Sequence, residues 1–246
     1  MRAFFNLSVI ELRLFFRERQ SVFWTFLYPV AMLWLFGVMF GKYQVDGVSY
    51  SNAYVPSWIG VNLLTISLFT IGTTLANYRE REILKRYQAT PIRSYTVLGA
   101  HAVLGIVIFL ISAVIMVVEG TFLFNLSVPK SISGLLLSLA VSLFAMFPFG
   151  LFLASIVKNT RAAAALATVV LNVMLLFSGA TFPLQEFPPS LQQVAKALPL
   201  YYVVDLLRKA WNSASLGSSV NDVWILLAIC IVTSVLAARL FRWQAD

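Results

Sequence analysis

The side chains that could carry out chemistry are few, and they lie far apart in the sequence. His101 is the single histidine and Cys230 the single cysteine, so these two types cannot build a metal cluster or an intrachain disulfide. No G-x-S-x-G motif offers a nucleophilic serine. The only Gly-Lys pair begins at Gly41 and has Phe36 where a phosphate-binding loop needs its first glycine. We therefore expect no catalytic residue, no metal site and no cofactor on this chain, and His101 is expected to be a packed or interfacial residue.

Six apolar stretches dominate the chain instead. Each is close to the roughly 20 residues that a helix needs to cross a hydrocarbon core. The composition is 60% hydrophobic and 11% charged. The sequence predicts an all-α membrane protein with six transmembrane helices, in a single domain over residues 1–246. The stretches are Val22–Phe40, Val55–Ala76, Leu98–Val118, Ser133–Val157, Ala162–Phe182 and Val223–Leu240.

Charge predicts the orientation of these spans. Of the 18 Lys and Arg residues, 13 fall on the side of the N-terminus, and basic residues in short loops favour the cytoplasmic side. Both termini are therefore expected in the cytoplasm. The inner face would carry the net charge of +8, which suits anionic lipids and an acidic partner surface. Short basic loops beside a membrane do not form a groove for nucleic acid, so that partner is excluded.

The first segment outside the spans is residues 1–21, in which aromatic residues alternate with charges. We expect a helix that lies in the inner membrane interface, with phenylalanines in the acyl boundary and arginines such as Arg13 and Arg17 at the headgroups. The alternative is a solvated first turn of the first span.

The second segment is residues 77–91, between the second and third spans. As a helix it would place Ile83, Leu84 and Tyr87 on one arc, and Pro91 disfavours helix at the preceding residue. These features favour a short amphipathic helix that docks into a groove on a cytoplasmic partner. The alternative is an ordinary charged loop.

The third segment lies between the last two spans, where Pro183, Pro188, Pro189 and Pro199 divide the chain into short pieces. Gln185–Leu198 and Leu200–Trp211 are each predicted as a short helix. Paired short helices can re-enter the membrane only if they satisfy their own backbone groups, which predicts a re-entrant hairpin over residues 183–211. Asp205 and Arg208 are at helical pairing distance and are expected to hold the second helix in place. The alternative is a folded surface loop.

These segments resemble the membrane-spanning subunit of an ABC-2 type ABC transporter, also called the type V exporter fold, and are most similar to bacterial drug and antibiotic exporters. The sequence differs from that family at Glu82, where a small residue is usual. The resemblance is carried by FWTFLYP and LFGVMFG around the first span and by REREILKR at residues 79–86, which the tripeptide Ala89-Thr90-Pro91 follows. It is also carried by SGATFP at 178–183 and LPLYYVVDLLR at 198–208.

The resemblance implies a function and its residues. It implies a subunit in the bacterial inner membrane that exports an amphipathic or lipid-like substrate, with a second permease copy or paralogue, membrane lipids, and two ATPase subunits that bind ATP and magnesium. Within the family, the alternative is an exporter of polysaccharide or lipid-linked glycan. The alternatives from other functional classes are an intramembrane enzyme and a passive channel. The sequence has no ring of charges of the kind that lines a channel. The implied ATPase-coupling residues are Arg79, Glu80, Arg81, Glu82, Ile83, Leu84 and Tyr87; the substrate path would use Asn62, Thr65, Phe69, Asn172, Leu176 and Phe177; the outer gate would use Pro183, Pro188, Tyr201, Tyr202, Asp205 and Arg208.

Asn62 and Asn172 have a second interpretation. Polar side chains inside a membrane also join neighbouring helices by hydrogen bonds, so either asparagine could serve packing instead of a path.

Overall fold

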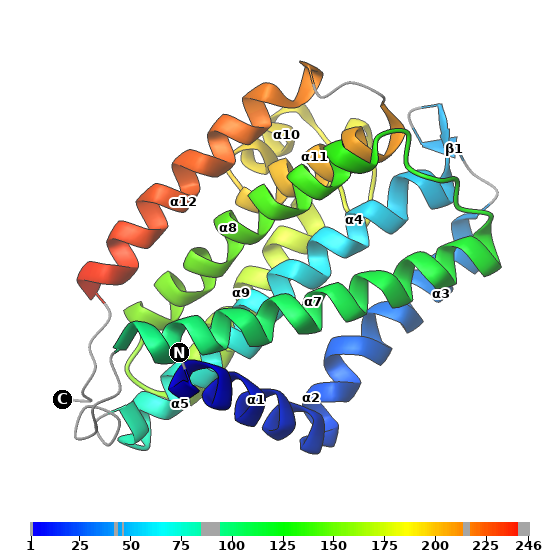
Figure 1. Cartoon of the computed structure of the whole chain (residues 1–246). Helices are drawn as coiled ribbons and strands as arrows, with labels where there is room; N and C mark the ends of the chain where they lie inside the picture. The colour runs from blue at the N-terminus through cyan, green and yellow to red at the C-terminus, as the bar shows by residue number, and fades with distance from the viewer. Residues whose placement is uncertain (1, 42–43, 46, 85–93, 214–216, 241–246) are drawn as a thin grey trace.

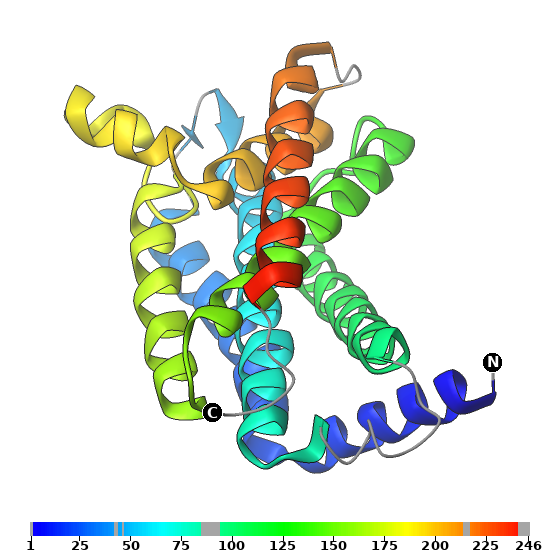
Figure 2. The ribbon, with the colours of Figure 1, turned by 90° about the vertical axis from the view of Figure 1, so that its left-hand side faces the viewer.

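The computed structural model describes residues 2–41, 44–45, 47–84, 94–213 and 217–240. Within them the protein is a bundle of helices that run between two ends, with helix α1 lying crosswise at one end (Figures 1 and 2). Six helical segments are long and apolar enough to cross a membrane, which confirms the six predicted spans and makes this a multi-pass membrane protein. They are Arg19–Phe40, Tyr50–Glu80, Thr96–Phe124, Ile132–Ile156, Thr160–Phe177 and Val220–Leu240.

A break in the helix at Glu18 separates α1 from the first span. Helix α1 (Arg2–Arg17) stops before Glu18, which is extended, and α2 (Arg19–Val22) begins after it. A π-helical segment, η1 (Phe23–Leu27), and α3 (Tyr28–Phe40) complete the span.

A two-stranded hairpin, β1 (Gln44–Val45) and β2 (Val48–Ser49), leads into the second span. That span consists of α4 (Tyr50–Thr65), a π-helical segment η2 (Ile66–Thr73) and α5 (Thr74–Glu80). Most of its side chains are buried, whereas those of the first, fifth and sixth spans mostly face outward. Span two is therefore the centre of the bundle.

Spans three to five are α7 (Ser94–Phe124), α8 (Ile132–Ile156) and α9 (Thr160–Phe177). Ser131 and Asn159 start α8 and α9 by accepting hydrogen bonds from the backbone N–H groups of Gly134 and Ala162. The α8 backbone crosses η2 closely at Gly150, where a Cβ would lie 2.2 Å from the Ser67 carbonyl oxygen.

The end of the bundle opposite α1 carries the short helices. They are the 3₁₀ turn η3 (Leu184–Glu186), α10 (Pro189–Lys196), α11 (Pro199–Asn212) and the 3₁₀ turn η4 (Gly217–Ser219), before α12 (Val220–Leu240) returns toward α1 (Figure 1). Pro189 and Pro199 occupy the first helical position of α10 and α11, where their missing N–H costs nothing.

Three predicted boundaries were wrong. The fifth span ends at Phe177, not Phe182, because Gly179 takes a φ of 78° and turns the chain. The helix predicted over Gln185–Leu198 is interrupted, because two successive prolines separate η3 from α10. Helix α5 ends at Glu80, and Glu82 has a φ of 56°, so the described part of the predicted 77–91 helix is broken there.

Candidate functional site

The candidate residues at the α1 end of the bundle begin with Arg79, at the last turn of span two. Its side chain is 4% exposed, and its guanidinium donates hydrogen bonds to the carbonyls of Ala154 and Val157 at the C-terminal end of α8. A helix C-terminus carries partial negative charge and unpaired carbonyls, so a buried guanidinium is stabilised there. Arg79, one of the implied ATPase-coupling residues, thus holds span two to the end of α8.

Glu80, the next residue, binds the start of α9. Its carboxylate accepts hydrogen bonds from the backbone N–H of Thr160 at 2.7 Å and from the hydroxyl of the same residue at 2.5 Å. Arg79 and Glu80 together thus grip both sides of the α8–α9 turn, and we call them the α8–α9 clasp. The clasp therefore connects the end of span two to spans four and five.

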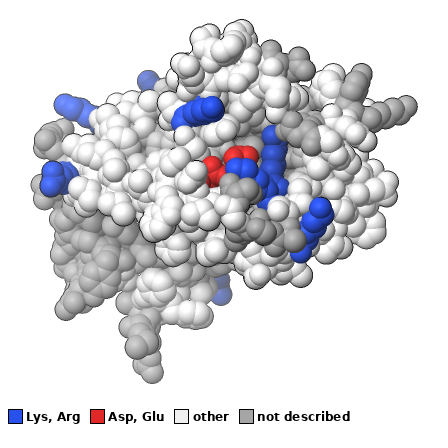
Figure 3. All heavy atoms as spheres, turned by 90° about the horizontal axis from the view of Figure 1, so that it is seen from above, with Lys and Arg blue, Asp and Glu red and all other residues white. Residues whose placement is uncertain are grey.

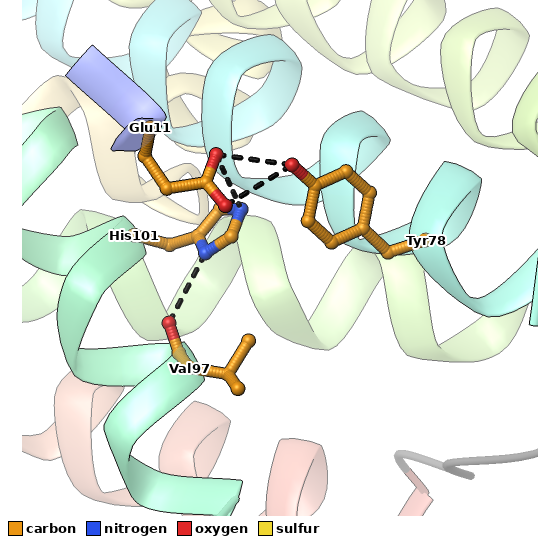
Figure 4. A network of polar contacts seen from close by, with 4 residues as sticks. All are labelled: Glu11, Tyr78, Val97 and His101. Carbon is orange, nitrogen blue, oxygen red and sulfur yellow. Dashed lines mark hydrogen bonds and ion pairs between the residues drawn. The ribbon is translucent and has the colours of Figure 1, made fainter. Parts of the chain in front are cut away.

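A buried polar cluster joins span two to α1 and α7 (Figure 4). The Tyr78 hydroxyl donates to both carboxylate oxygens of Glu11, at 3.1 and 3.0 Å. His101 lies edge-on to the Tyr78 ring, with its Nε2 3.8 Å from Glu11 Oε2 and its Nδ1 3.1 Å from the Val97 carbonyl. Glu11 and His101 are 3% and 0% exposed. The three side chains, here named the inner junction, come from three different elements.

Apolar packing beside the inner junction fixes the start of the coupling segment. Leu84 is fully buried with Leu7 of α1 and with Val97 and Ala100 of α7. Leu84 therefore does not face a partner groove in this structure; it braces the segment against α1 and α7 of its own chain.

The remaining coupling candidates divide between surface and undescribed residues. Arg81 and Glu82 are exposed and Ile83 is half-buried. Tyr87 lies outside the described residues, as does the rest of the predicted helix up to Pro91.

At the opposite end, Arg208 of α11 joins three elements. Its Nε donates to the Ala53 carbonyl at 3.0 Å and to the Ser57 hydroxyl at 2.6 Å, and its Nη2 donates to the Gly179 carbonyl at 2.7 Å. The guanidinium also lies over the ring of Tyr54, 5.7 Å from its centroid. Arg208 therefore binds α11 to span two and to the turn after α9, an arrangement that we call the outer clamp.

The predicted Asp205–Arg208 pair was wrong. Asp205 binds Lys209 at 2.6 Å, and Lys209 also binds Asp222 of α12 at 2.9 Å, whereas Arg208 faces span two. Burial favours the neutral form of Lys209, but its hydrogen bonds to the two carboxylates raise its pKa above the ordinary value. Seen from this end, the surface is mostly uncharged, with acidic side chains gathered beside basic ones (Figure 3). Asp205 therefore pairs with the residue four positions later in α11, and not with the residue three positions later.

The other outer-gate candidates lie on or near two helices, α10 and α11, that differ in burial. The apolar face of α11 is buried, and Tyr201 and Tyr202 lie at its start, where the Tyr202 hydroxyl donates to the Lys196 carbonyl. Pro188 and most of α10 are exposed, and Pro183 is half-buried. The two halves of the predicted hairpin are therefore an inner, packed helix and an outer, exposed one.

The two asparagines of the predicted path have different environments. Asn62 is 1% exposed and donates to the Thr25 carbonyl at 3.0 Å, in the π-helical segment of span one. It serves helix packing, the second interpretation given above. Asn172 is exposed on α9 and donates to the Thr168 carbonyl of its own helix. Of the other candidates, Leu176 is exposed, and the partly buried ones are Thr65, Phe69 and Phe177.

Sequence reasoning missed the inner junction. Glu11 was only one residue of the predicted interface helix, and Tyr78 lay at the start of the predicted coupling helix, with no role of its own. One signal was available: Glu11 lies four residues from Leu7 and Phe15, both large apolar residues, on one helix face. Its partners are 67 and 90 residues away, and no spacing rule connects them.

The fold and these sites define a class. The described residues hold no group of three metal-ligating side chains, and their polar clusters join helices to each other. This is a multi-pass helical membrane protein with a mechanical junction at one end and a clamp at the other. The family model for ABC-2 type transporters matches residues 2–211, and the chain belongs to this family. It is the membrane permease subunit and not the ATPase, and membership implies association with an ABC ATPase subunit.

The curated relatives are distant in sequence, but their matches cover most of this chain. The chain is 21% identical to the "Putative transport permease YvfS" of Bacillus subtilis (strain 168), over 96% of each chain. It is 25% identical to the "Probable multidrug ABC transporter permease YbhR" of Escherichia coli (strain K12), over 78% of this chain and 55% of that one. It is 28% identical to "Nodulation protein J" of Neorhizobium galegae, over 79% and 72%. The chain thus spans about half the length of one of these relatives.

Proposed function

We propose that this permease forms the membrane part of an ATP-driven exporter that moves an amphipathic or lipid-like substrate out of the cytoplasm or the inner leaflet. Two permease chains, identical or paralogous, would stand on two ATPase subunits in a bacterial inner membrane. The observation that carries the proposal is the α8–α9 clasp, because it gives the end of span two a rigid connection to two further spans. The printed name of the YbhR relative supports an amphipathic drug-like substrate.

The coupling step would begin at the exposed residues after the clasp. The exposed Arg81 would face the ATPase, while Leu84 keeps the segment on α1 and α7. When ATP closes the two ATPases, a push on this segment would move Tyr78, Arg79 and Glu80 together, and spans four and five with them.

The orientation follows from charge and from α1. Helix α1 lies crosswise to the bundle, with Phe5 and Phe16 exposed on one side and Arg13 and Arg17 exposed on another. This distribution suits an interface helix on the cytoplasmic leaflet. In a Cys230→Ser background, a cysteine at the exposed Ser190 of α10 is expected to react with an impermeant maleimide from outside, and one at Gln88 only after the cytoplasmic side is opened. The reverse pattern would invert the topology.

The substrate path is proposed along the exposed face of α9. Thr168, Asn172 and Leu176 lie on one stripe with Ala165, and polar groups on a membrane helix are costly unless they face a cavity or another chain. The exposed helix α10 would close this path from outside, in contact with the second permease chain.

A charge reversal tests the proposed coupling surface. Arg81→Glu is expected to lower co-purification of the ATPase and substrate-stimulated ATP hydrolysis, since the exposed cation would face the partner. Arg161→Glu, an exposed cation at the start of α9, is the matched control. Equal losses in both variants would mean that net inner charge, and not a docking surface at Arg81, binds the ATPase.

A further inference from the structure

Glu119 is an acidic residue inside the third span, and it has no partner among the residues that the structure describes. It lies on α7 within the last two turns before Phe124, and it is 9% exposed. Both oxygens of its carboxyl group are closed off from solvent and make no hydrogen bond or ion pair there. An unpaired carboxylate in apolar surroundings is so costly that the group becomes neutral instead. A buried acid of this kind in a membrane span needs an explanation beyond packing.

The part of α7 around Glu119 packs closely against α3 and the start of α4 (Figure 1). A Cβ on the next residue, Gly120, would lie 2.8 Å from Cγ2 of Val55 in α4. Phe124 lies edge-on to the ring of Tyr50, with 6.4 Å between the ring centroids, and it fills the space beside Gly37 of α3. These contacts keep the last turns of α7 against two other spans while the carboxyl group is closed off from solvent.

The titratable groups that face Glu119 supply no positive charge. From α4, the phenol of Tyr50 is near enough to interact with Glu119 electrostatically, and its hydroxyl is likewise buried without a hydrogen bond. Tyr54 stacks on Tyr50, and Arg208 lies over the Tyr54 ring, where it is bound in the outer clamp. From α3, Tyr28 is the single titratable residue, and it lies at the opposite end of that helix. The other titratable residues of α7 lie in its first three turns. Within the part of the chain that the structure describes, a proton is therefore what neutralises this carboxyl group.

We propose that Glu119 is a proton-binding site at which the carboxyl group is neutral in this fold, and that loss of the proton releases the end of α7 from the start of span two. On deprotonation the O–H bond breaks and the proton goes to water, and the carboxylate that remains has no cation to pair with among the described residues. Such a charge is stabilised in contact with water, which it reaches when α7 moves away from α4.

A metal ion fits this place less well than a proton. Calcium takes six to eight oxygen ligands, whereas the unpartnered side-chain oxygens here are those of Glu119 and Tyr50. Under the topology proposed above, this end of the bundle faces the outside, so the site would respond to external pH.

Infrared spectroscopy tests the protonation directly, because a neutral carboxylic acid and a carboxylate absorb at separate frequencies. The full chain is measured at neutral pH in maltoside detergent, which has no carbonyl group. The wild-type spectrum is expected to contain a carboxylic-acid band that is missing from Glu119→Gln, a variant with a side chain of similar size and no proton to lose. Glu18→Gln, which changes an exposed glutamate, is the matched control and should keep the band. A Glu119→Gln spectrum that has lost no carboxylic-acid intensity would overturn the proposal.

The dependence of stability on pH gives a second test. An unfolded glutamate is ionised at neutral pH, whereas folded Glu119 keeps its proton, so the folded state binds one proton more and is destabilised as the pH rises. The equilibrium constant for unfolding in detergent is therefore expected to rise more steeply with pH in the wild type than in Glu119→Gln, by up to about tenfold for each pH unit. Equal slopes, with a large loss of stability in Tyr50→Phe, would contradict the proposal and indicate an ionised carboxylate held by the phenol.

Hydrogen–deuterium exchange tests the release of α7. Exchange is measured below and above the pH at which the infrared band disappears, and it is corrected for the pH dependence of the chemical rate. We expect amide protection to fall in residues 50–55 and 116–124 of the wild type at the higher pH, and to stay unchanged in Glu119→Gln. Unchanged protection in the wild type would overturn the release. These readouts need neither ATP nor a substrate, so their failure would leave the proposed export function untouched.

Discussion

The two ends of span two hold a peripheral helix in different ways. At the outer clamp, Arg208 of α11 donates to two backbone carbonyls, those of Ala53 and Gly179, and to one hydroxyl. At the inner junction, Glu11, Tyr78 and His101 bind each other through their side chains alone, apart from one contact to a backbone carbonyl.

This difference separates a fixed end from a movable one. The Ala53 carbonyl belongs to a helix and cannot change its position without local unfolding, so its bond to Arg208 ties α11 to span two. Side chains change rotamers and partners far more easily, so the inner junction can rearrange while the bundle stays folded. We therefore expect ATP-driven motion to be concentrated at the inner end, with α11 as part of the frame.

The largest effect is expected from breaking the outer clamp. Arg208→Ala removes three hydrogen bonds from a charged donor and is expected to lower the free energy of unfolding by about 3 kcal/mol. Denaturation of the purified protein in one detergent measures this. Lys196→Ala, which removes an exposed cation of α10, should cost less than about 1 kcal/mol. Similar losses for both would remove the distinction between the clamp and a surface cation.

A second substitution breaks the α8–α9 clasp. Arg79→Met keeps much of the side-chain volume but removes the bonds to the end of α8, and the transport per ATP hydrolysed is expected to fall about tenfold. ATP hydrolysis itself should continue. Arg161→Met, an exposed cation on α9, controls for lost charge. Normal transport in the Arg79 variant would show that span two moves spans four and five by packing alone.

A smaller effect is expected at the inner junction. Tyr78→Phe removes the donor to the Glu11 carboxylate and leaves that buried group short of one partner, at a cost of about 1.5 kcal/mol. Tyr202→Phe, which loses an exposed hydroxyl contact, should be near neutral.

A double-mutant cycle sharpens this test. Glu11→Leu and Tyr78→Phe are expected to be strongly non-additive, because each removes the same interaction. Strict additivity would mean that the two side chains are energetically independent despite their contact.

The sequence predicted the spans because they depend on local properties. An apolar run of about 20 residues needs no knowledge of its neighbours. The same reasoning failed for side chains whose hydrogen-bond partners lie far away in the sequence. Arg208 could be placed on α11, but its acceptors at Ala53 and Ser57 lie more than 150 residues away in the chain.

The helix predicted for the coupling segment was wrong for a second reason. Its helical arc was plausible locally, but Glu82 adopts a left-handed conformation at a position where the resembled family usually has a small residue. The helix therefore stops, and Leu84 packs inward against Leu7. A wheel diagram places side chains on faces, but it cannot tell which face meets the rest of the protein.

Hydrogen–deuterium exchange across the ATPase cycle tests the central claim most directly. The permease–ATPase complex is compared without nucleotide and trapped with ATP by a hydrolysis-deficient ATPase, and amide protection is read by mass spectrometry. We predict a change in protection in residues 7–11, 78–84 and 97–101, while α11 from Leu200 to Trp211 keeps its protection. A change in α11 as large as that at the inner junction would contradict the account, because the outer clamp would then move with the ATPase.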